Sequence, residues 1–310
     1  MTRRIVATLC FLSVLISGLV LTQSLQIRSS STGRSPDSGR FQPNSQAIVG
    51  EQTVSEPVTP VSTGAVRDLP DDQPSEDMLL EREVNPRINW GFNPFQRYKS
   101  GPDPLLDVQA SARAAVDASF LSTILNTNGQ TYSSVNPPDP SGDVGPNHFV
   151  QMINASSGAS VTIYDKNLNL IKGPFMLDAL GAGNCASGLG DPIVLYDRLA
   201  DRWLLSEFSN GGNKLCLYVS QTPDPTGAYH NYEFTGANGF PDYPKYGVWP
   251  DAYYAGTNES ALNTPVPTVY AFDRVNMLAG NPATYQSFNM PRLSGFGFQM
   301  LTPSDLDGAT

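Results

Sequence analysis

Three short stretches decide the fold: Asn147-His148-Phe149, Asp201-Arg202-Trp203 and Asp251-Ala252-Tyr253. In each stretch a turn-forming Asn or Asp stands two residues before an aromatic side chain that opens an apolar run. From Phe149 to Trp203 is 54 residues, and from Trp203 to Tyr253 is 50. A pattern that returns at nearly constant spacing indicates a structural repeat of about fifty residues.

Each repeat reads as a small antiparallel sheet. A candidate strand precedes each turn, a second follows it, and a third comes later. The predicted first strands are 143–145, 193–196 and 246–248, the second are 149–154, 203–208 and 253–258, and the third end at 165, 220 and 273. A unit of three or four such strands has the size of a propeller blade. We therefore predict an all-β region of antiparallel, propeller-like blades over residues 109–310, with a generic β-sandwich of coincidental spacing as the alternative.

The number of repeats is small for a propeller. About three can be counted, whereas propellers commonly have four to eight blades. The chain ends in polar turn residues from Pro303 to Thr310. We expect an incomplete propeller that is truncated at its C-terminal end.

The N-terminus has the pattern of a secretory signal. Arg3 and Arg4 precede a continuous apolar run over 5–21, and Thr22-Gln23-Ser24 offers a small-x-small cleavage site. We predict a signal peptide at 1–24, with an uncleaved membrane anchor as the alternative because the run is long. The predicted location is extracytoplasmic, secreted or at the cell surface.

Residues 25–108 differ in composition from the rest of the chain. They are rich in Ser, Thr, Pro, Gly, Gln and acidic residues, with few apolar positions and no sustained period. Such a segment buries too little surface to offset the entropy of ordering it. We predict a disordered spacer, followed by a short helix within 105–124 where apolar residues recur every three to four positions.

The net charge and the cysteine content restrict the kinds of partner and metal site that the chain can have. The net charge of -10 argues against nucleic acid, which requires clustered Lys and Arg. Cys185 and Cys216 are the cysteines that remain after cleavage, and an even pair in an oxidising compartment predicts a disulfide, with two buried free thiols as the alternative. Only His148 and His230 could join them, which is too few ligands for a zinc site.

The amino-acid sequences of the predicted strands resemble those of a known group of proteins. The residues that carry the resemblance, which covers about 118–310, are Pro137-Pro138-Asp139-Pro140-Ser141-Gly142-Asp143-Val144-Gly145-Pro146-Asn147-His148, Gly190-Asp191-Pro192-Ile193-Val194-Leu195-Tyr196-Asp197 and Asp242-Tyr243-Pro244-Lys245-Tyr246-Gly247-Val248. They are similar to a group of secreted bacterial proteins of no established activity, which look like β-propellers distantly similar to the sialidase-type superfamily. The sialidase Asp-box and an evident set of three arginines are absent here, so the resemblance does not imply sialidase activity.

Carboxylates near the first strands are the main candidates for ligand binding or catalysis in the repeats. The candidate ligand or Ca²⁺-binding residues are Asp143, Asp191, Asp242 and Asp251, with Tyr243 and Trp249 as stacking surfaces. Equivalent positions in successive blades point toward one axis, so we expect these residues to converge there. Their acidity suits Ca²⁺ or general acid-base chemistry. The alternatives are carboxylates that bond turn backbone and rings that pack between blades.

Two other features are weaker. Glu207 and Glu259 stand at the ends of second strands and add to the carboxylates. The run from Gly181 to Ala186 spells a dinucleotide fingerprint, but a β-rich run follows it instead of a helix, which predicts an inter-blade loop.

These observations leave three classes of function open. The first is an exported propeller that binds a glycan, peptide or protein ligand outside the cell. The second is a polysaccharide-active hydrolase or lyase that uses carboxylates from several blades. The third is a structural or adhesion module. No cofactor is indicated apart from the candidate Ca²⁺, and contact with a membrane is expected only through an uncleaved N-terminal segment.

Overall fold

The computed structural model describes residues 52–71, 80–81, 125–209, 211–261, 264–292 and 298–306. The predicted signal peptide at 1–24 and the predicted helix within 105–124 lie outside these residues. In the described part of the chain, no helix is both long enough and apolar enough to cross a membrane.

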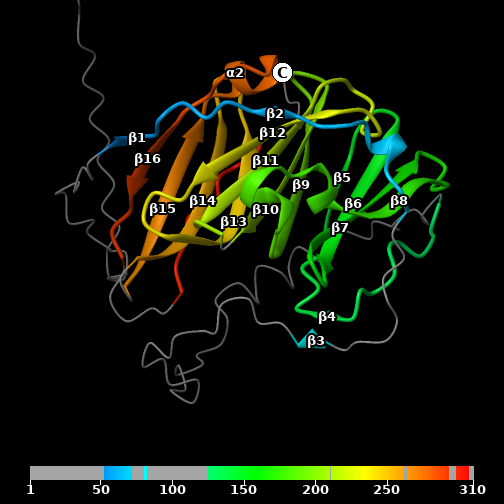
Figure 1. The fold of residues 1–310 in the computed structure, drawn as a ribbon, viewed down its shortest axis with the longest axis horizontal. Helices are drawn as coiled ribbons and strands as arrows, with labels where there is room; N and C mark the ends of the chain where they lie inside the picture. The colour runs from blue at the N-terminus through cyan, green and yellow to red at the C-terminus, as the bar shows by residue number, and fades with distance from the viewer. Residues whose placement is uncertain are drawn as a thin grey trace, which may run out of the picture. The chain divides into compact units, whose positions relative to one another are not determined.

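The described residues are nearly all β, and they form three antiparallel sheets of the predicted size (Figure 1). Blade 1 consists of β5 (Ser141–Val144), β6 (His148–Ala155), β7 (Gly158–Asp165) and β8 (Leu170–Met176). Blade 2 consists of β9 (Gly190–Asp197), β10 (Arg202–Ser209), β11 (Lys214–Ser220) and β12 (Tyr229–Thr235). Blade 3 consists of β13 (Phe240–Val248), β14 (Tyr253–Ala261), β15 (Thr264–Phe272) and β16 (Tyr285–Asn289).

Strand order within each blade decides between the two predicted architectures. In every blade the four strands pair in the order of the chain. A β-sandwich would exchange strands between two sheets, so the propeller-like prediction holds and the sandwich alternative does not. The fourth strands β8, β12 and β16 complete each unit, which the sequence left at three or four strands.

The blades stack through two apolar layers, because alternate side chains of each strand point to opposite faces of its sheet. Between blades 1 and 2 lie Val150, Val161, Phe175, Trp203 and Tyr218, all at most 1% exposed. Between blades 2 and 3 lie Leu217, Phe234, Tyr253, Tyr270 and Phe272, all at most 2% exposed. Tyr253, Tyr270 and Phe272 therefore serve as core, whereas Tyr243 and Trp249, the two predicted stacking surfaces, are 45% and 36% exposed.

A buried ion pair adds a polar link between blades 2 and 3. Asp197, at the end of β9, is fully buried and accepts two hydrogen bonds from the Arg274 guanidinium, at 2.7 and 2.9 Å. The Tyr253 hydroxyl donates a third, at 2.8 Å. Arg274 opens the short helix α2 (Arg274–Ala279), which Asp273 caps by accepting from the backbone of Asn276.

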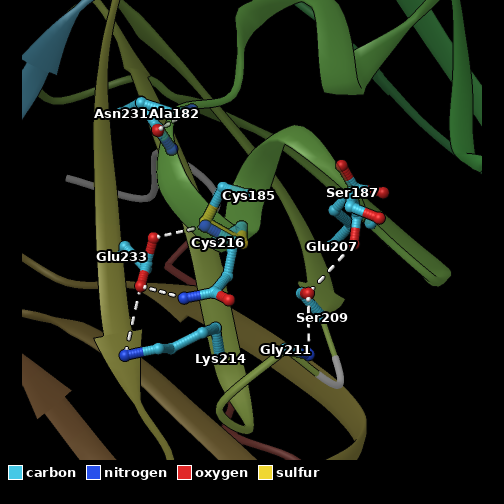
Figure 2. Close-up of a disulfide and its surroundings, with 12 residues drawn as sticks. Ala182, Cys185, Ser187, Glu207, Ser209, Gly211, Lys214, Cys216, Asn231 and Glu233 are labelled. Atoms are coloured by element: carbon cyan, nitrogen blue, oxygen red, sulfur yellow. Dashed lines mark hydrogen bonds and ion pairs between the residues drawn. A yellow bond between two sulfur atoms is a disulfide. The ribbon is translucent and has the colours of Figure 1, made fainter.

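The predicted disulfide is present (Figure 2). Cys185 lies in the 3-10 helix η3 (Gly183–Ala186), which follows η2 (Leu177–Leu180), and its sulfur is bonded to that of Cys216 on β11. The same loop is held by Glu233, which accepts from the backbone of Asn184 at 2.8 Å and pairs with Lys214 at 3.1 Å. The Gly181–Ala186 run is thus an inter-blade connection, as predicted.

One part of the predicted disordered spacer has a different structure. Within 25–108, residues 52–71 contain β1 (Thr53–Val54), β2 (Val61–Ser62) and η1 (Val66–Asp68), and β3 (Leu80–Glu81) pairs with β4 (Val135–Asn136). β1 and β2 add a strand to the outer edges of blades 3 and 2. The polar composition predicted disorder for residues 52–71 as well. Backbone hydrogen bonds, which are independent of side-chain polarity, nevertheless order this segment.

Residues 298–306 lie against blade 3 on the face opposite blade 2. The Val248 backbone N–H donates to Asp305 at 2.6 Å, and the Leu306 N–H donates to the Val248 carbonyl at 3.2 Å. A Cβ on Gly256 would come within 1.8 Å of the Leu301 carbonyl oxygen. A glycine in β14 therefore permits this close backbone approach.

Candidate functional site

The first strands of the three blades lie side by side, with β9 in contact with both β5 and β13. A proline with an irregular neighbour lies just before β5, at the third residue of β9 and at the fifth residue of β13. Pro140, Pro192 and Pro244 are spaced 52 residues apart in both intervals. The residue before each has a positive φ, at 38° for Asp139, 50° for Asp191 and 54° for Tyr243. Positive φ is unfavourable for residues other than Gly, so the fold repeats a strained position just before the proline of each blade's first-strand region.

These positions bring carboxylates from all three blades together. Asp139, which precedes β5, shares a side-chain hydrogen bond with Asp191 of β9. Asp242 of β13 acts on the same group electrostatically. Asn154 of β6 bridges the first two, since its Nδ2 donates to Asp139 at 2.7 Å and its Oδ1 accepts from the Asp191 backbone at 2.8 Å. The axial cluster is defined as Asp139, Asp191, Asp242 and Lys245.

The electrostatics of the axial cluster favour a proton on one carboxyl. Partial burial, and then the charge and hydrogen bond of Asp139, raise the pKa of Asp191 from 3.8 to about 7. Burial lowers the pKa of Lys245, and the negative charges of Asp191, Asp139 and Asp242 oppose that change. Near neutral pH the cluster therefore offers a carboxyl that can donate a hydrogen bond, carboxylates that accept one, and an ammonium that donates.

An exposed aromatic ring borders the cluster. Tyr243, which follows Asp242, is 45% exposed. The Lys245 ammonium lies 3.9 Å from the centroid of its ring, and the Phe298 ring packs edge-on at 5.5 Å. The ring is thus partly exposed beside charged and hydrogen-bonding groups.

The other predicted site residues lie elsewhere. Asp143, Trp249 and Asp251 stand near the turns that end the first strands. In the axial cluster, by contrast, Asp139 precedes β5, Asp191 is the second residue of β9, and Asp242 and Lys245 lie within β13. Asp143 accepts from the Tyr196 backbone at 2.7 Å and so joins β5 to β9. Trp249 donates to the Ser304 carbonyl at 2.9 Å. Exposed Asp251 accepts from the Tyr254 hydroxyl at 2.8 Å. Of the six predicted residues, the structure groups Asp191, Asp242 and Tyr243.

The two second-strand glutamates are structural in their contacts. Glu207 is fully buried and accepts from the Ala159 backbone of blade 1 at 3.0 Å. Burial, and then the charge of Asp178, raise its pKa well above 4.5. Glu259 accepts from the Asn238 backbone and from the Tyr270 hydroxyl. Both carboxyls lie inside blade interfaces, away from solvent.

Asp139 and Lys245 were missed by the reasoning from sequence. Asp143 was grouped with Asp191 because both stand near the first strand of their unit. The regular 52-residue spacing of the three prolines was the signal that would have selected Asp139 instead. Within the described residues, no group of three or more His, Cys, Asp or Glu side chains is placed to hold a metal ion, and the Ca²⁺ hypothesis stays a prediction.

Comparisons with known proteins give no residue roles that can be transferred to this chain. No family model matches the chain. No curated protein matches it either. Among solved structures it is similar to a mutant of a GH32 β-fructofuranosidase from Bombyx mori in complex with sucrose, with 10% identity, 46% of each chain covered and a TM-score of 0.26. The chain thus spans about half the length of that enzyme, and a TM-score this low supports no transfer of residue roles.

Proposed function

We propose that this protein is an exported, propeller-like module that binds a glycan through the axial cluster. The observation that carries the proposal is the hydrogen-bonded pair of Asp139 and Asp191, supplied by two blades, beside Asp242 and Lys245 from the third. Groups that both donate and accept hydrogen bonds match the hydroxyls of a sugar.

Two further features support a ligand site here. Strained backbone at Asp139, Asp191 and Tyr243 is of the kind that persists at functional positions because the surrounding structure holds it. The Tyr243 side chain is 45% exposed beside the cluster, and a partly exposed aromatic ring suits contact with a sugar ring. The type of glycan follows from neither feature, so the test uses a broad panel.

The test measures binding of the protein to soluble polysaccharides that are neutral, acidic or amino-substituted. Asp191→Asn should lower the affinity for the polysaccharide that binds by about tenfold or more, because one hydrogen-bonding partner of the site changes. Asp251→Asn is the matched control and should bind as the wild type does. Equal loss in both variants, or binding that Asp191→Asn leaves intact, would refute the axial site.

A polysaccharide hydrolase is the second candidate, and the pKa of about 7 for Asp191 favours it. A carboxyl that stays protonated near neutral pH beside a second carboxyl is the arrangement of a general acid with its partner. The expected result is release of reducing ends that declines as pH rises above about 7, where the acid loses its proton. Binding without any release of reducing ends would leave the binding module as the function.

A further inference from the structure

The segment 52–71, here called the strap, contacts the blades through a repeat of its own. Ser55 and Tyr285 of blade 3 exchange two hydrogen bonds, from the Ser55 N–H to the Tyr285 carbonyl and from the Tyr285 N–H to the Ser55 hydroxyl, both 2.9 Å. Eight residues later, Thr63 and Tyr229 of blade 2 make the same two bonds at the same lengths. Tyr285 and Tyr229 each begin the outermost strand of their blade.

A valine repeats with the same spacing. The Val58 N–H donates to the Ala283 carbonyl at 2.8 Å, and the Val66 N–H donates to the Gly227 carbonyl at 3.0 Å. Ala283 and Gly227 each stand two residues before the tyrosine of the pair described above. Val66 is fully buried in the layer between blades 1 and 2, and Val58 packs on the layer between blades 2 and 3. Each octapeptide of the strap thus supplies one hydroxyl and one apolar anchor.

The contact extends to blade 1 at the next eight-residue step. Asp71 accepts from the Gly173 backbone of β8 at 3.3 Å and pairs with Lys172 at 2.8 Å. The strap therefore meets blade 3, then blade 2, then blade 1, in the reverse of their order in the chain (Figure 1, blue). It covers outer edges that otherwise present unpaired backbone groups.

We propose that the strap can dissociate from the blades and bind them again, with the outer edges of the three blades as its docking surface. The strap also binds when it is supplied as a separate peptide. The pairing is β-strand addition: main-chain hydrogen bonds give affinity, and the valine positions give register. Residues 72–140 join the strap to blade 1, and within them β3 pairs with β4.

The experiment cuts the strap from the full chain. A specific protease recognition sequence replaces residues 74–79, the protein is cleaved after folding, and gel filtration tests whether the cut strap stays bound. A fluorescent peptide of residues 52–71 is then added in excess, and fluorescence anisotropy follows its entry. The expected result is retention of the cut strap and saturable exchange with the peptide.

Matched peptides make the test specific. Val66→Asp places a charge at a fully buried position and should weaken peptide binding by more than about tenfold. Val61→Asp makes the same change at a position that is 50% exposed and should weaken binding by less than about threefold. Failure of the wild-type peptide to enter, whether the cut strap leaves or stays, overturns the proposal. Equal binding by the two substituted peptides also overturns it.

Discussion

Replacing Asp191 by Asn should make the protein more stable at neutral pH while it weakens ligand binding. Asn is close to Asp in size, tolerates a positive φ, and can donate a hydrogen bond to Asp139 without carrying a charge. In the wild type, the pKa of Asp191 rises from 3.8 to about 7 on folding. Each pKa unit corresponds to 1.36 kcal/mol, so the ionised group lowers stability by up to about 4 kcal/mol above pH 7.

The sign of the pH dependence follows from the raised pKa. Below about pH 4 the carboxyl is protonated in both the folded and the unfolded chain, so it contributes no difference. Between about pH 4 and 7 the folded chain binds more protons than the unfolded chain, and stability falls as pH rises. Asp191→Asn should lack this decline, so the gap between variant and wild type should open across that window.

Urea unfolding at pH 4, 6 and 8 measures the effect. The two proteins should have similar free energies of unfolding at pH 4, and Asp191→Asn should be more stable at pH 8. Asp251→Asn, at an exposed position, should track the wild type at all three pH values. If Asp191→Asn is less stable than the wild type at pH 8, the carboxyl contributes as a structural ion, and the reasoning from its surroundings is wrong.

Three further predictions concern the blade interfaces. Asp197→Asn should lower the free energy of unfolding by about 3 to 5 kcal/mol, because Arg274 keeps a buried charge without its partner; urea unfolding checks this, and a loss below about 1 kcal/mol would contradict it. Replacing Cys185 and Cys216 by Ser should cost about 3 to 4 kcal/mol, from the 31-residue separation in the chain-entropy model; an unchanged melting temperature would argue against that. Glu207→Gln should gain stability relative to the wild type as pH rises above 4.5, since the raised pKa of Glu207 makes its ionisation unfavourable in the folded chain; parallel unfolding curves at pH 5 and 8 would exclude this.

The sequence alone predicted the blade architecture and the disulfide, and the structure decided against the alternatives of a β-sandwich and two free thiols. A turn residue two positions before an aromatic, returned three times at about fifty residues, fixes where hairpins form because turn chemistry and alternation act locally. Cys185 and Cys216 could be paired because few alternatives existed. The class of fold followed from these local signals.

Only the tertiary structure decided which residues meet at the axis. It also decided which contacts hold the strap in an ordered position. Asp139 and Asp191 come from different blades, and the packing of those blades brings their carboxyls together. The proline spacing marks Asp139 in the sequence but does not show this contact. Asp143, four residues later, lies nearer the other end of the same short strand and bonds backbone instead. The position of a side chain along and across a strand depends on register, which pairing with neighbouring strands sets.

The strap shows the same limit more strongly. Its composition is that of a disordered segment, yet backbone hydrogen bonds, which every sequence can make, combine with a few side-chain contacts to hold it on the blades. Val58 and Val66 are two apolar residues in a polar stretch, and their anchoring role depends on apolar layers built by blade residues more than eighty positions away. Local sequence reports on local structure, whereas docking onto distant edges is a property of the assembled blades, which is why only the folded chain revealed it.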